Sequence, residues 1–212
     1  GMPFSDPMAD GPTIQESSVR SIAGGTKIND ILEIVSKVRK LNNEIPIILM
    51  GYYNSIFNMG IKSFTSKCAD VGVDGLIIVD LQPEEDADLY KEAKEKNIDL
   101  IRLITPTTDE ERLKTILNTA SGFLYYVTIT GITGQNSADI DHLRKSINLI
   151  KLSTKLPIVA GFGIKNRKDV ENISNFTDGV VVGSSIVNII KKNLQDKKKM
   201  LIEIDTFTKD LK

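Results

Sequence analysis

The segment "DGLIIVDLQPEEDADLYKEAKEKN", residues 74–97, joins two patterns that together decide the fold class. Its first seven residues are almost continuously apolar, which is typical of a β-strand buried on both faces in a parallel sheet. The part from Glu84 onward has the pattern of an amphipathic helix, with acidic residues in the first turn, where the helix dipole favours them. The segment therefore predicts a β-strand that leads into an α-helix.

The same pattern of an apolar run followed by a helix recurs along the whole chain. The apolar runs cover residues 45–53, 74–80, 98–105, 122–129, 156–163 and 178–184. A further helix is predicted over 27–41, before the first run, and two more close the chain. Strands that alternate with helices predict βα units and a parallel sheet. We count six such units, and because no linker or low-complexity tract interrupts them, we expect residues 1–212 to form a single domain.

Six βα units fit two architectures, a doubly wound open sheet or a (β/α)₈ barrel with two strands unaccounted for. Polar residues and glycines follow the carboxyl ends of the runs: Tyr52, Asn54, Asp80, Thr105, Tyr125, Gly163, Gly183 and Ser184. A barrel collects all of these positions on the one face where its active site is built. An open sheet uses mainly the crevice at its switch point. The spread of polar residues over many strand ends favours the barrel.

Composition excludes several classes of function. The 212 residues carry a formal net charge of −1, so nothing in the overall charge favours nucleic acid or an anionic membrane as a partner. The single cysteine rules out a disulfide framework and fits a cytoplasmic location, and the single histidine excludes a histidine-based zinc site, so we expect no metal. No apolar stretch approaches the ~20 residues that a membrane-spanning helix needs.

Two late glycine clusters are candidates for phosphate binding. They are "GFGI", residues 161–164, and "VGSSIV", residues 182–187, and each ends an apolar run. In a barrel the loops after the last two strands, with a helix N-terminus, often bind phosphate. This placement predicts a phosphate site at Gly163, Gly183 and Ser184. The alternative is that these glycines only make tight turns between strand and helix.

The polar segment "TITGITGQNSAD", residues 128–139, is long for a strand-to-helix connection, which suggests either a mobile lid or a surface loop. Gly131 and Gly134 are its plausible hinges.

Two carboxylates are also candidate site residues. Composition alone favours Asp10 as a helix cap, because Asp before Gly-Pro is common turn chemistry. Asp80, at a strand end, is equally compatible with a structural ion pair and with a site acid.

Several of these stretches together resemble the α subunit of tryptophan synthase. The matching pieces occur in the same order and at similar spacing as in that family: "PFSDPMADGPTIQ", "GYYNSIFNMG", "VDGLIIVDLQPEE", "YYVTITGITG", "GFGI" and "VGSSIV". The resemblance implies a TIM barrel that cleaves indole-3-glycerol phosphate to indole and glyceraldehyde 3-phosphate by a retro-aldol reaction. It also implies that this chain needs no cofactor, and that indole passes to a partner β subunit, which holds pyridoxal phosphate.

The resemblance assigns roles to individual residues. It implies that Asp10 contacts the indole nitrogen, that Tyr125 lies beside the substrate, and that Thr133 orders the site when the loop closes. The implied phosphate-binding residues are Gly134, Gly163, Gly183 and Ser184. The implied lining of the indole pocket is Phe162, Ile14, Met50 and Ile77. The stretch from Pro3 to Asp10, including Asp6, is expected to face the β subunit. Support of the site and the interface is expected from Tyr52, Asn54 and Asp80.

The chain departs from the family pattern at its start. The family places a strand, a helix and a second strand before "PFSDP", and the second strand ends in an essential glutamate. Here only Gly1 and Met2 precede that motif. We therefore expect an N-terminally truncated barrel with little or no lyase activity of its own, because the glutamate is the general acid–base. We also expect self-association, since six strands leave two edges open.

Two other functions are compatible with parts of the sequence. One is a non-catalytic module that binds a phosphate ligand or the β subunit through residues 3–10. The other is a different phosphate-binding barrel, such as an isomerase of histidine biosynthesis. The glycine clusters fit this second option, whereas "PFSDPMADGP" does not.

Overall fold

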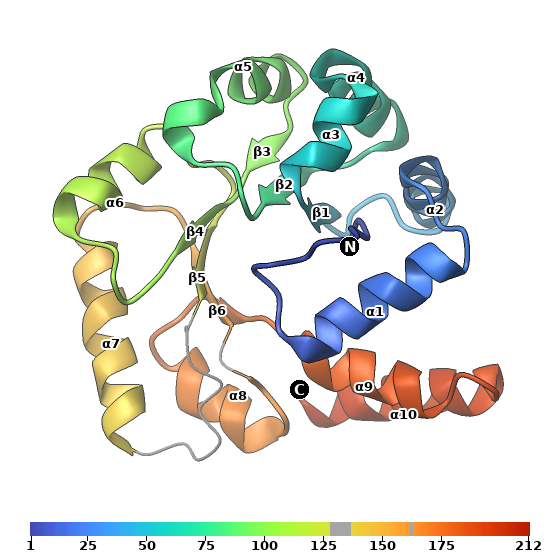
Figure 1. The fold of residues 1–212 in the computed structure, drawn as a ribbon. Helices are drawn as coiled ribbons and strands as arrows, with labels where there is room; N and C mark the ends of the chain where they lie inside the picture. Colours follow the sequence, from blue (N-terminus) through green and yellow to red (C-terminus); the bar gives the residue numbers. More distant parts are fainter. Residues whose placement is uncertain (128–136, 162) are drawn as a thin grey trace. The chain divides into compact units, whose positions relative to one another are not determined.

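The computed structural model describes residues 1–127, 137–161 and 163–212. The chain divides into two compact units. Their helices and strands are labelled in Figure 1. The first unit comprises Gly1–Arg102 and Lys114–Gly122, and the second comprises Leu103–Leu113 and Phe123–Lys212. The prediction of a single domain stays a prediction.

The first unit is built on a three-stranded sheet in the order β1-β2-β3, with both strand pairs parallel. The strands are β1 (Ile48–Gly51), β2 (Gly75–Ile78) and β3 (Asp99–Leu100). The helices are α1 (Pro12–Ala23), α2 (Ile28–Leu41), α3 (Tyr53–Met59), α4 (Ile61–Val71) and α5 (Ala87–Glu95), with a short 3₁₀ helix at Pro83–Glu85. Sheet and helices alternate along the chain as the apolar runs predict.

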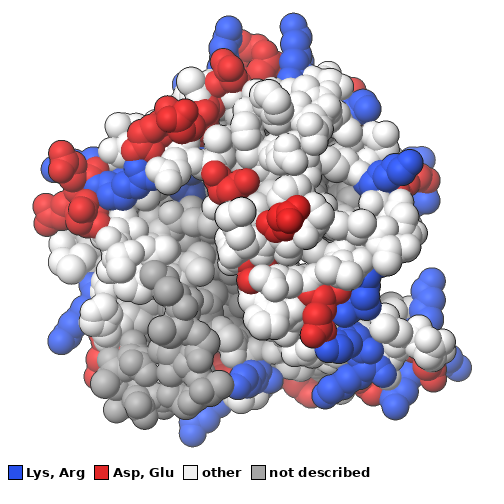
Figure 2. Space-filling model, in the orientation of Figure 1, with Lys and Arg blue, Asp and Glu red and all other residues white. Residues whose placement is uncertain are grey.

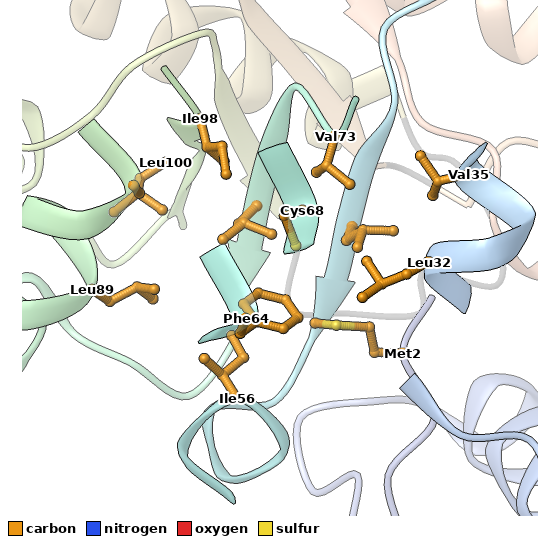
Figure 3. Packing of buried hydrophobic residues seen from close by; sticks show 13 residues of the cluster. Met2, Leu32, Val35, Ile56, Phe64, Cys68, Val73, Leu89, Ile98 and Leu100 are labelled. Carbon is orange, nitrogen blue, oxygen red and sulfur yellow. The ribbon is translucent and has the colours of Figure 1, made fainter. Parts of the chain in front are cut away.

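The hydrophobic core of the first unit gathers side chains from the sheet, from α2 before it and from the helices that follow its strands (Figure 3). Phe64 and Cys68 of α4 are fully buried in it, so the single cysteine is a core residue. Burial raises the pKa of the Cys68 thiol to about 12. Met2 joins the same cluster, and its backbone N–H donates to the Met50 carbonyl at 2.8 Å. The start of the chain is thereby fixed beside β1.

The second unit contains a four-stranded sheet in the order β4-β5-β6-β7. Its strands are β4 (Arg102–Ile104), β5 (Leu124–Val127), β6 (Ile158–Gly161) and β7 (Gly179–Val180). Its helices are α6 (Glu110–Leu117), α7 (Ser137–Lys151), α8 (Arg167–Ser174), α9 (Ser184–Lys192) and α10 (Lys197–Asp210). The boundary between the units falls inside β4 and α6. The pairs β5–β6 and β6–β7 are parallel, which confirms the parallel α/β organisation.

Two elements differ from the sequence prediction. The helix that follows the first apolar run is divided at Gly60, whose φ of 83° lies in the left-handed region that suits glycine, so that α3 ends and α4 begins there. The expected strand over 98–105 is interrupted at Ile101, between β3 and β4. Each of the six predicted apolar runs nevertheless contains strand residues.

One structural device recurs at the start of a strand in each unit. In the first unit, the Asp74 N–H donates to the Ile47 carbonyl at 2.9 Å. The Asp74 carboxylate accepts the Ile47 N–H at 2.6 Å and pairs with Arg39 of α2. One aspartate thus joins the start of β2 to the start of β1 and to α2, the helix before β1.

The second unit repeats this arrangement with Asp178. Its N–H donates to the Ile158 carbonyl at 2.9 Å, and its carboxylate accepts the Ile158 N–H at 2.8 Å. Lys151 of α7 lies 3.2 Å from the same carboxylate. The pKa of Asp178 is lowered, first by the Ile158 N–H and then by Lys151, while partial burial acts in the opposite direction. The sequence pattern Asp-Gly before an apolar run marks both positions.

A buried ion pair lies within the first unit. The Asp86 and Arg102 side chains pair, and these residues are only 2% and 8% exposed. The Arg102 guanidinium also donates to the Thr119 hydroxyl at 2.8 Å, whereas its Nε has no hydrogen-bond partner within the described part of the chain. This pair ties the beginning of β4 to the residue before α5 and to the segment after α6.

Arg102→Met and Asp86→Ala are each expected to lower the free energy of unfolding by ~3–5 kcal/mol, because each leaves a buried charge uncompensated. The double variant Arg102→Met/Asp86→Leu is expected to lose less than either single variant. Urea denaturation provides the measurement. As a control, Lys37→Met removes an ion pair whose side chains are 67% and 62% exposed, and it is expected to cost less than ~1 kcal/mol. Additive losses in the double variant would contradict the assignment.

The lowered pKa of Asp178 predicts a pH-dependent contribution to stability. A group whose pKa is lower in the folded state stabilises the fold above its ordinary value of 3.8, and this stabilisation disappears as pH falls through the folded value. Asp178→Asn is therefore expected to reduce stability at pH 7, and the difference from wild type is expected to be smaller at pH 3, below the ordinary value. The measurement is urea unfolding at both pH values, with Asp210→Asn as the control. A difference that stays constant between the two pH values would rule out this role.

Candidate functional site

In the first unit, the segment before α1 is held to the carboxyl end of β1 by Tyr52. The Tyr52 hydroxyl accepts the Ala9 N–H at 3.0 Å and donates to the Asp10 carboxylate at 2.9 Å. The ring stacks on Phe4 with 5.1 Å between the ring centroids, and Tyr52 is only 3% exposed. A residue fixed directly behind a strand thus determines where the Asp10 carboxylate lies.

Asp10 does not cap α1. The residue at the N-cap is Gly11, and no side chain makes a capping hydrogen bond there. The carboxylate of the half-buried Asp10 instead accepts from Tyr52, and its backbone carbonyl accepts from the Gln15 side chain at 2.9 Å. The cap role that composition favours is therefore wrong, and the side chain is directed to a strand end.

Asp80 lies at the same end of the sheet, two residues after β2. Its carboxylate accepts the Tyr53 N–H, at the first residue of α3, at 2.8 Å. Burial, together with the hydrogen bond to Asp10 and the negative charges of Asp10 and Asp80, raises the pKa of Tyr52 to about 12. The N–H of Ala9 acts in the opposite direction. The Tyr52 hydroxyl therefore stays protonated, and remains a donor to Asp10, throughout the physiological pH range.

The predicted pocket residues of the first unit have defined positions. Met50 and Ile77 are partners in the parallel register of β1 and β2. Because side chains alternate along a strand, and Leu49 and Leu76 belong to the helix-side core, Met50 and Ile77 lie on the opposite face of the sheet. Ile14 of α1 is half-buried.

The residues expected to support the site or the interface are partly accessible. Pro3 is half-buried, whereas Asp6 and Asn54 are exposed. The Ser5 hydroxyl donates to the Asp6 carboxylate. The accessibility of Asp6 and Asn54 is compatible with an interface role.

In the second unit, the structure joins the two predicted glycine clusters. Gly183 is the N-cap of α9, Ser184 is its first residue, and both are exposed, as is Gly163. The Ser185 hydroxyl donates to the Ile164 carbonyl at 2.6 Å, which ties the start of α9 to the segment after β6. Sequence reasoning missed Ser185, although the second serine of "VGSSIV" was the available signal.

Tyr125 lies in β5, and its hydroxyl lies against Gly161 of β6. A Cβ at Gly161 would be 2.5 Å from the Tyr125 hydroxyl oxygen, so the close approach of this side chain requires a glycine. Tyr125 is half-buried. Gly161 is a further residue that the sequence analysis did not assign a role.

Three predicted site residues, Thr133, Gly134 and Phe162, lie outside the described residues. Within the described part of the chain, no group of three or more His, Cys, Asp or Glu side chains is arranged to hold a metal ion. None of the described helices is long and apolar enough to cross a membrane. On the face shown in Figure 2, acidic and basic side chains are interspersed, mainly around the edge.

Comparisons with known proteins agree on one family. The family model described as "Tryptophan synthase alpha chain" matches residues 1–212. The chain is 46% identical over 211 residues to the tryptophan synthase alpha chain of Zymomonas mobilis, covering 100% of this chain and 77% of that protein. It is 42% identical over 212 residues to that of Petrotoga mobilis, covering 82% of that protein. Both relatives are longer than this chain. The expected truncation stays a prediction.

Solved structures give the same result for the fold. The crystal structure of tryptophan synthase subunit alpha from Legionella pneumophila superposes with a TM-score of 0.91 at 36% identity, covering 100% of this chain and 78% of that one. A chain in the α2β2 tryptophan synthase complex of Pyrococcus furiosus gives a TM-score of 0.86 at 34% identity, covering 99% and 83% respectively. The predicted TIM-barrel fold class is confirmed by this agreement. The chain belongs to the tryptophan synthase alpha chain family, a family of lyases in tryptophan biosynthesis.

Proposed function

We propose that this chain binds indole-3-glycerol phosphate, the substrate that the family cleaves to indole and glyceraldehyde 3-phosphate, with the Asp10 carboxylate receiving the indole N–H and with little or no turnover by residues 1–212 alone. The observation that carries the proposal is the hydrogen bond from Tyr52 to Asp10, which holds a half-buried carboxylate at the carboxyl ends of the strands. That is the end at which barrel enzymes build their sites.

The proposed reaction is a retro-aldol cleavage. Protonation of the indole ring at C3 places positive charge on the ring nitrogen, where a carboxylate stabilises it. The proton for C3 comes from a general acid–base, which also takes the proton from the adjacent side-chain hydroxyl, so that the aldehyde carbonyl forms; the family resemblance gives this role to a glutamate, and we assign it to none of the described residues. The bond between C3 and the side-chain carbon breaks, and its electron pair returns to the ring. The products are indole and glyceraldehyde 3-phosphate, and no step needs a cofactor.

Each unit, taken by itself, offers a further candidate binding surface. Met50 and Ile77, adjacent on one face of the first sheet, offer an apolar surface for the indole ring. In the second unit, the start of α9 and the segment after β6 are tied together by Ser185, and the exposed Gly183 and Ser184 support phosphate binding there. A helix N-terminus favours an anion through its free N–H groups and its dipole.

We also infer a β subunit as the partner. The related chain of Pyrococcus furiosus is part of an α2β2 complex. The segment from Pro3 to Asp10 is the candidate contact, because its exposed residue Asp6 and the site residue Asp10 belong to one short segment. Binding of a partner there would act directly on the residues that position the Asp10 carboxylate.

Asp10→Asn is expected to weaken the binding of indole-3-glycerol phosphate to this chain by roughly 10-fold or more, because a hydrogen bond to a charged group is lost. Isothermal titration calorimetry measures the affinity, and an indole-release assay with and without an added β subunit measures turnover. Asp88→Asn, an exposed acid in the first turn of α5, is the matched control. Unchanged binding in Asp10→Asn would refute the assignment of Asp10. Binding without indole release under either condition would favour the non-catalytic alternative.

Tyr52→Phe is expected to weaken substrate binding by about 3- to 10-fold, because it frees the Asp10 carboxylate without removing it. In the Asp10→Asn background the same substitution is expected to add little, since both variants disrupt one arrangement. Tyr53→Phe, one residue along the chain, serves as the control. Independent, multiplicative effects of Tyr52→Phe and Asp10→Asn would show that Tyr52 does not act through Asp10.

A further inference from the structure

The first unit contains a cavity of about 260 Å³ beside the amino end of β3. It is lined by Tyr90, Lys94, Asn97, Ile98, Asp99, Leu100, Thr119, Ala120 and Ser121. Asp99 is the first residue of β3 and pairs in register with Gly75, the first residue of β2. The cavity therefore lies at the opposite end of the sheet from Tyr52 and Asp80. The proposed lyase reaction makes no use of it.

Asp99 contributes a negative charge to the cavity wall. Its half-buried carboxylate has neither a hydrogen bond nor an ion pair within the part of the chain that the structure describes. It lies over Gly122, where a Cβ would be 2.9 Å from a carboxylate oxygen, and Gly122 has a φ of +71°. The glycine thus leaves room for the carboxylate. A bound cation at this position would give the Asp99 carboxylate a partner of opposite charge.

Lys94 contributes a positive charge to the same cavity. Its ammonium lies 5.4 Å from the centre of the Tyr90 ring and 3.4 Å from the Tyr90 hydroxyl. Among the described residues it forms no ion pair with Asp99 or any other acid. The ring contact holds the ammonium in place, while most of its hydrogen-bond donors stay available for an anion.

Two hydroxyls and an apolar patch complete the lining. The Ser121 hydroxyl accepts the Leu100 N–H at 2.9 Å, and the Thr119 hydroxyl accepts from Arg102 at 2.8 Å. Because each oxygen already accepts a bond, each hydroxyl hydrogen is free to be donated to a ligand. Ile98 and Leu100, which belong to the hydrophobic core, form the apolar part of the lining.

We propose that this cavity binds a small zwitterion of the free amino acid type. Its ammonium would bind Asp99, and its carboxylate would bind Lys94 and the two hydroxyls. A ligand with one charge would meet an opposite charge at only one of Asp99 and Lys94, whereas a zwitterion would meet one at both. The volume lies below the ~300–1,000 Å³ of typical ligand pockets, so the ligand must be small. An apolar side chain of a few carbons would contact Ile98 and Leu100.

L-valine is a suitable probe, with L-valinamide and N-acetyl-L-valine as matched compounds that each keep one of its two charges. The experiment follows the amide resonances of Leu100 and Ser121 of the full chain by NMR during titration. L-valine is expected to give saturable shifts, and each matched compound is expected to bind at least 10-fold more weakly. Equal binding of all three compounds would overturn the proposal, and so would the absence of a saturable shift with L-valine up to about 100 mM, a concentration about 100 times the Kd of a millimolar site.

Variants locate the ligand within the cavity. Lys94→Met and Asp99→Asn are each expected to weaken L-valine binding at least 10-fold, whereas Lys91→Met, an exposed lysine on the same helix, is expected to leave it unchanged. If Asp99→Asn does not fold, Lys94→Met carries the test, because its side chain is exposed. Wild-type affinity in Lys94→Met would overturn the proposal. Asp10→Asn is expected to bind L-valine normally, which separates this site from the lyase site.

Discussion

The placement of the Tyr52 hydroxyl is the constraint on which the candidate lyase site depends. Tyr52 directly follows β1 and is buried against Phe4, so the sheet determines where its oxygen lies. That oxygen binds the Ala9 N–H and the Asp10 carboxylate on either side. A segment without regular secondary structure is thereby positioned by a strand. The raised pKa of Tyr52 keeps its hydroxyl protonated, and so able to donate to Asp10, in the physiological pH range.

The amino ends of the strands are fixed by different chemistry. Asp74 joins β2 to β1, and Asp178 joins β7 to β6, each through two hydrogen bonds to one backbone residue and an ion pair to the preceding helix. A pairing register that is fixed at the amino ends of two strands also fixes which residues lie beside each other at their carboxyl ends. These contacts therefore also align the strand ends where the site residues lie. Stability and chemistry are thus divided between the two ends of the strands, which is the general plan of barrel enzymes.

Much of the fold follows from sequence patterns, because burial on both faces makes parallel strands continuously apolar. All six strand regions and the helix over 28–41 were predictable on this basis. The break at Gly60 was not, since its cause is a left-handed backbone conformation inside an otherwise helical pattern. The repeated role of Asp74 and Asp178 was equally hidden, because an Asp-Gly pair is ordinary turn chemistry until its partners are known.

The candidate site shows the same limit. The placement of glycines alone indicates the segments of Gly163 and Gly183. Phosphate binding there would use backbone groups, and a glycine in the sequence is a direct signal of an accessible backbone. Composition favours Asp10 as a cap, which the N-cap at Gly11 and the hydrogen bond from Tyr52 contradict. Its partner Tyr52 lies 42 residues away along the chain, and no local pattern contains that contact. Ser185 was missed for the same reason, because its acceptor lies on a different strand-to-helix connection.

The most direct test of this account is a crystal structure of the chain with indole-3-glycerol phosphate bound. The account predicts that the indole N–H lies within ~3 Å of the Asp10 carboxylate while the Tyr52 hydroxyl still donates to that carboxylate. An indole ring bound away from Asp10, or an Asp10 carboxylate that has left Tyr52 and contacts no part of the ligand, would contradict it.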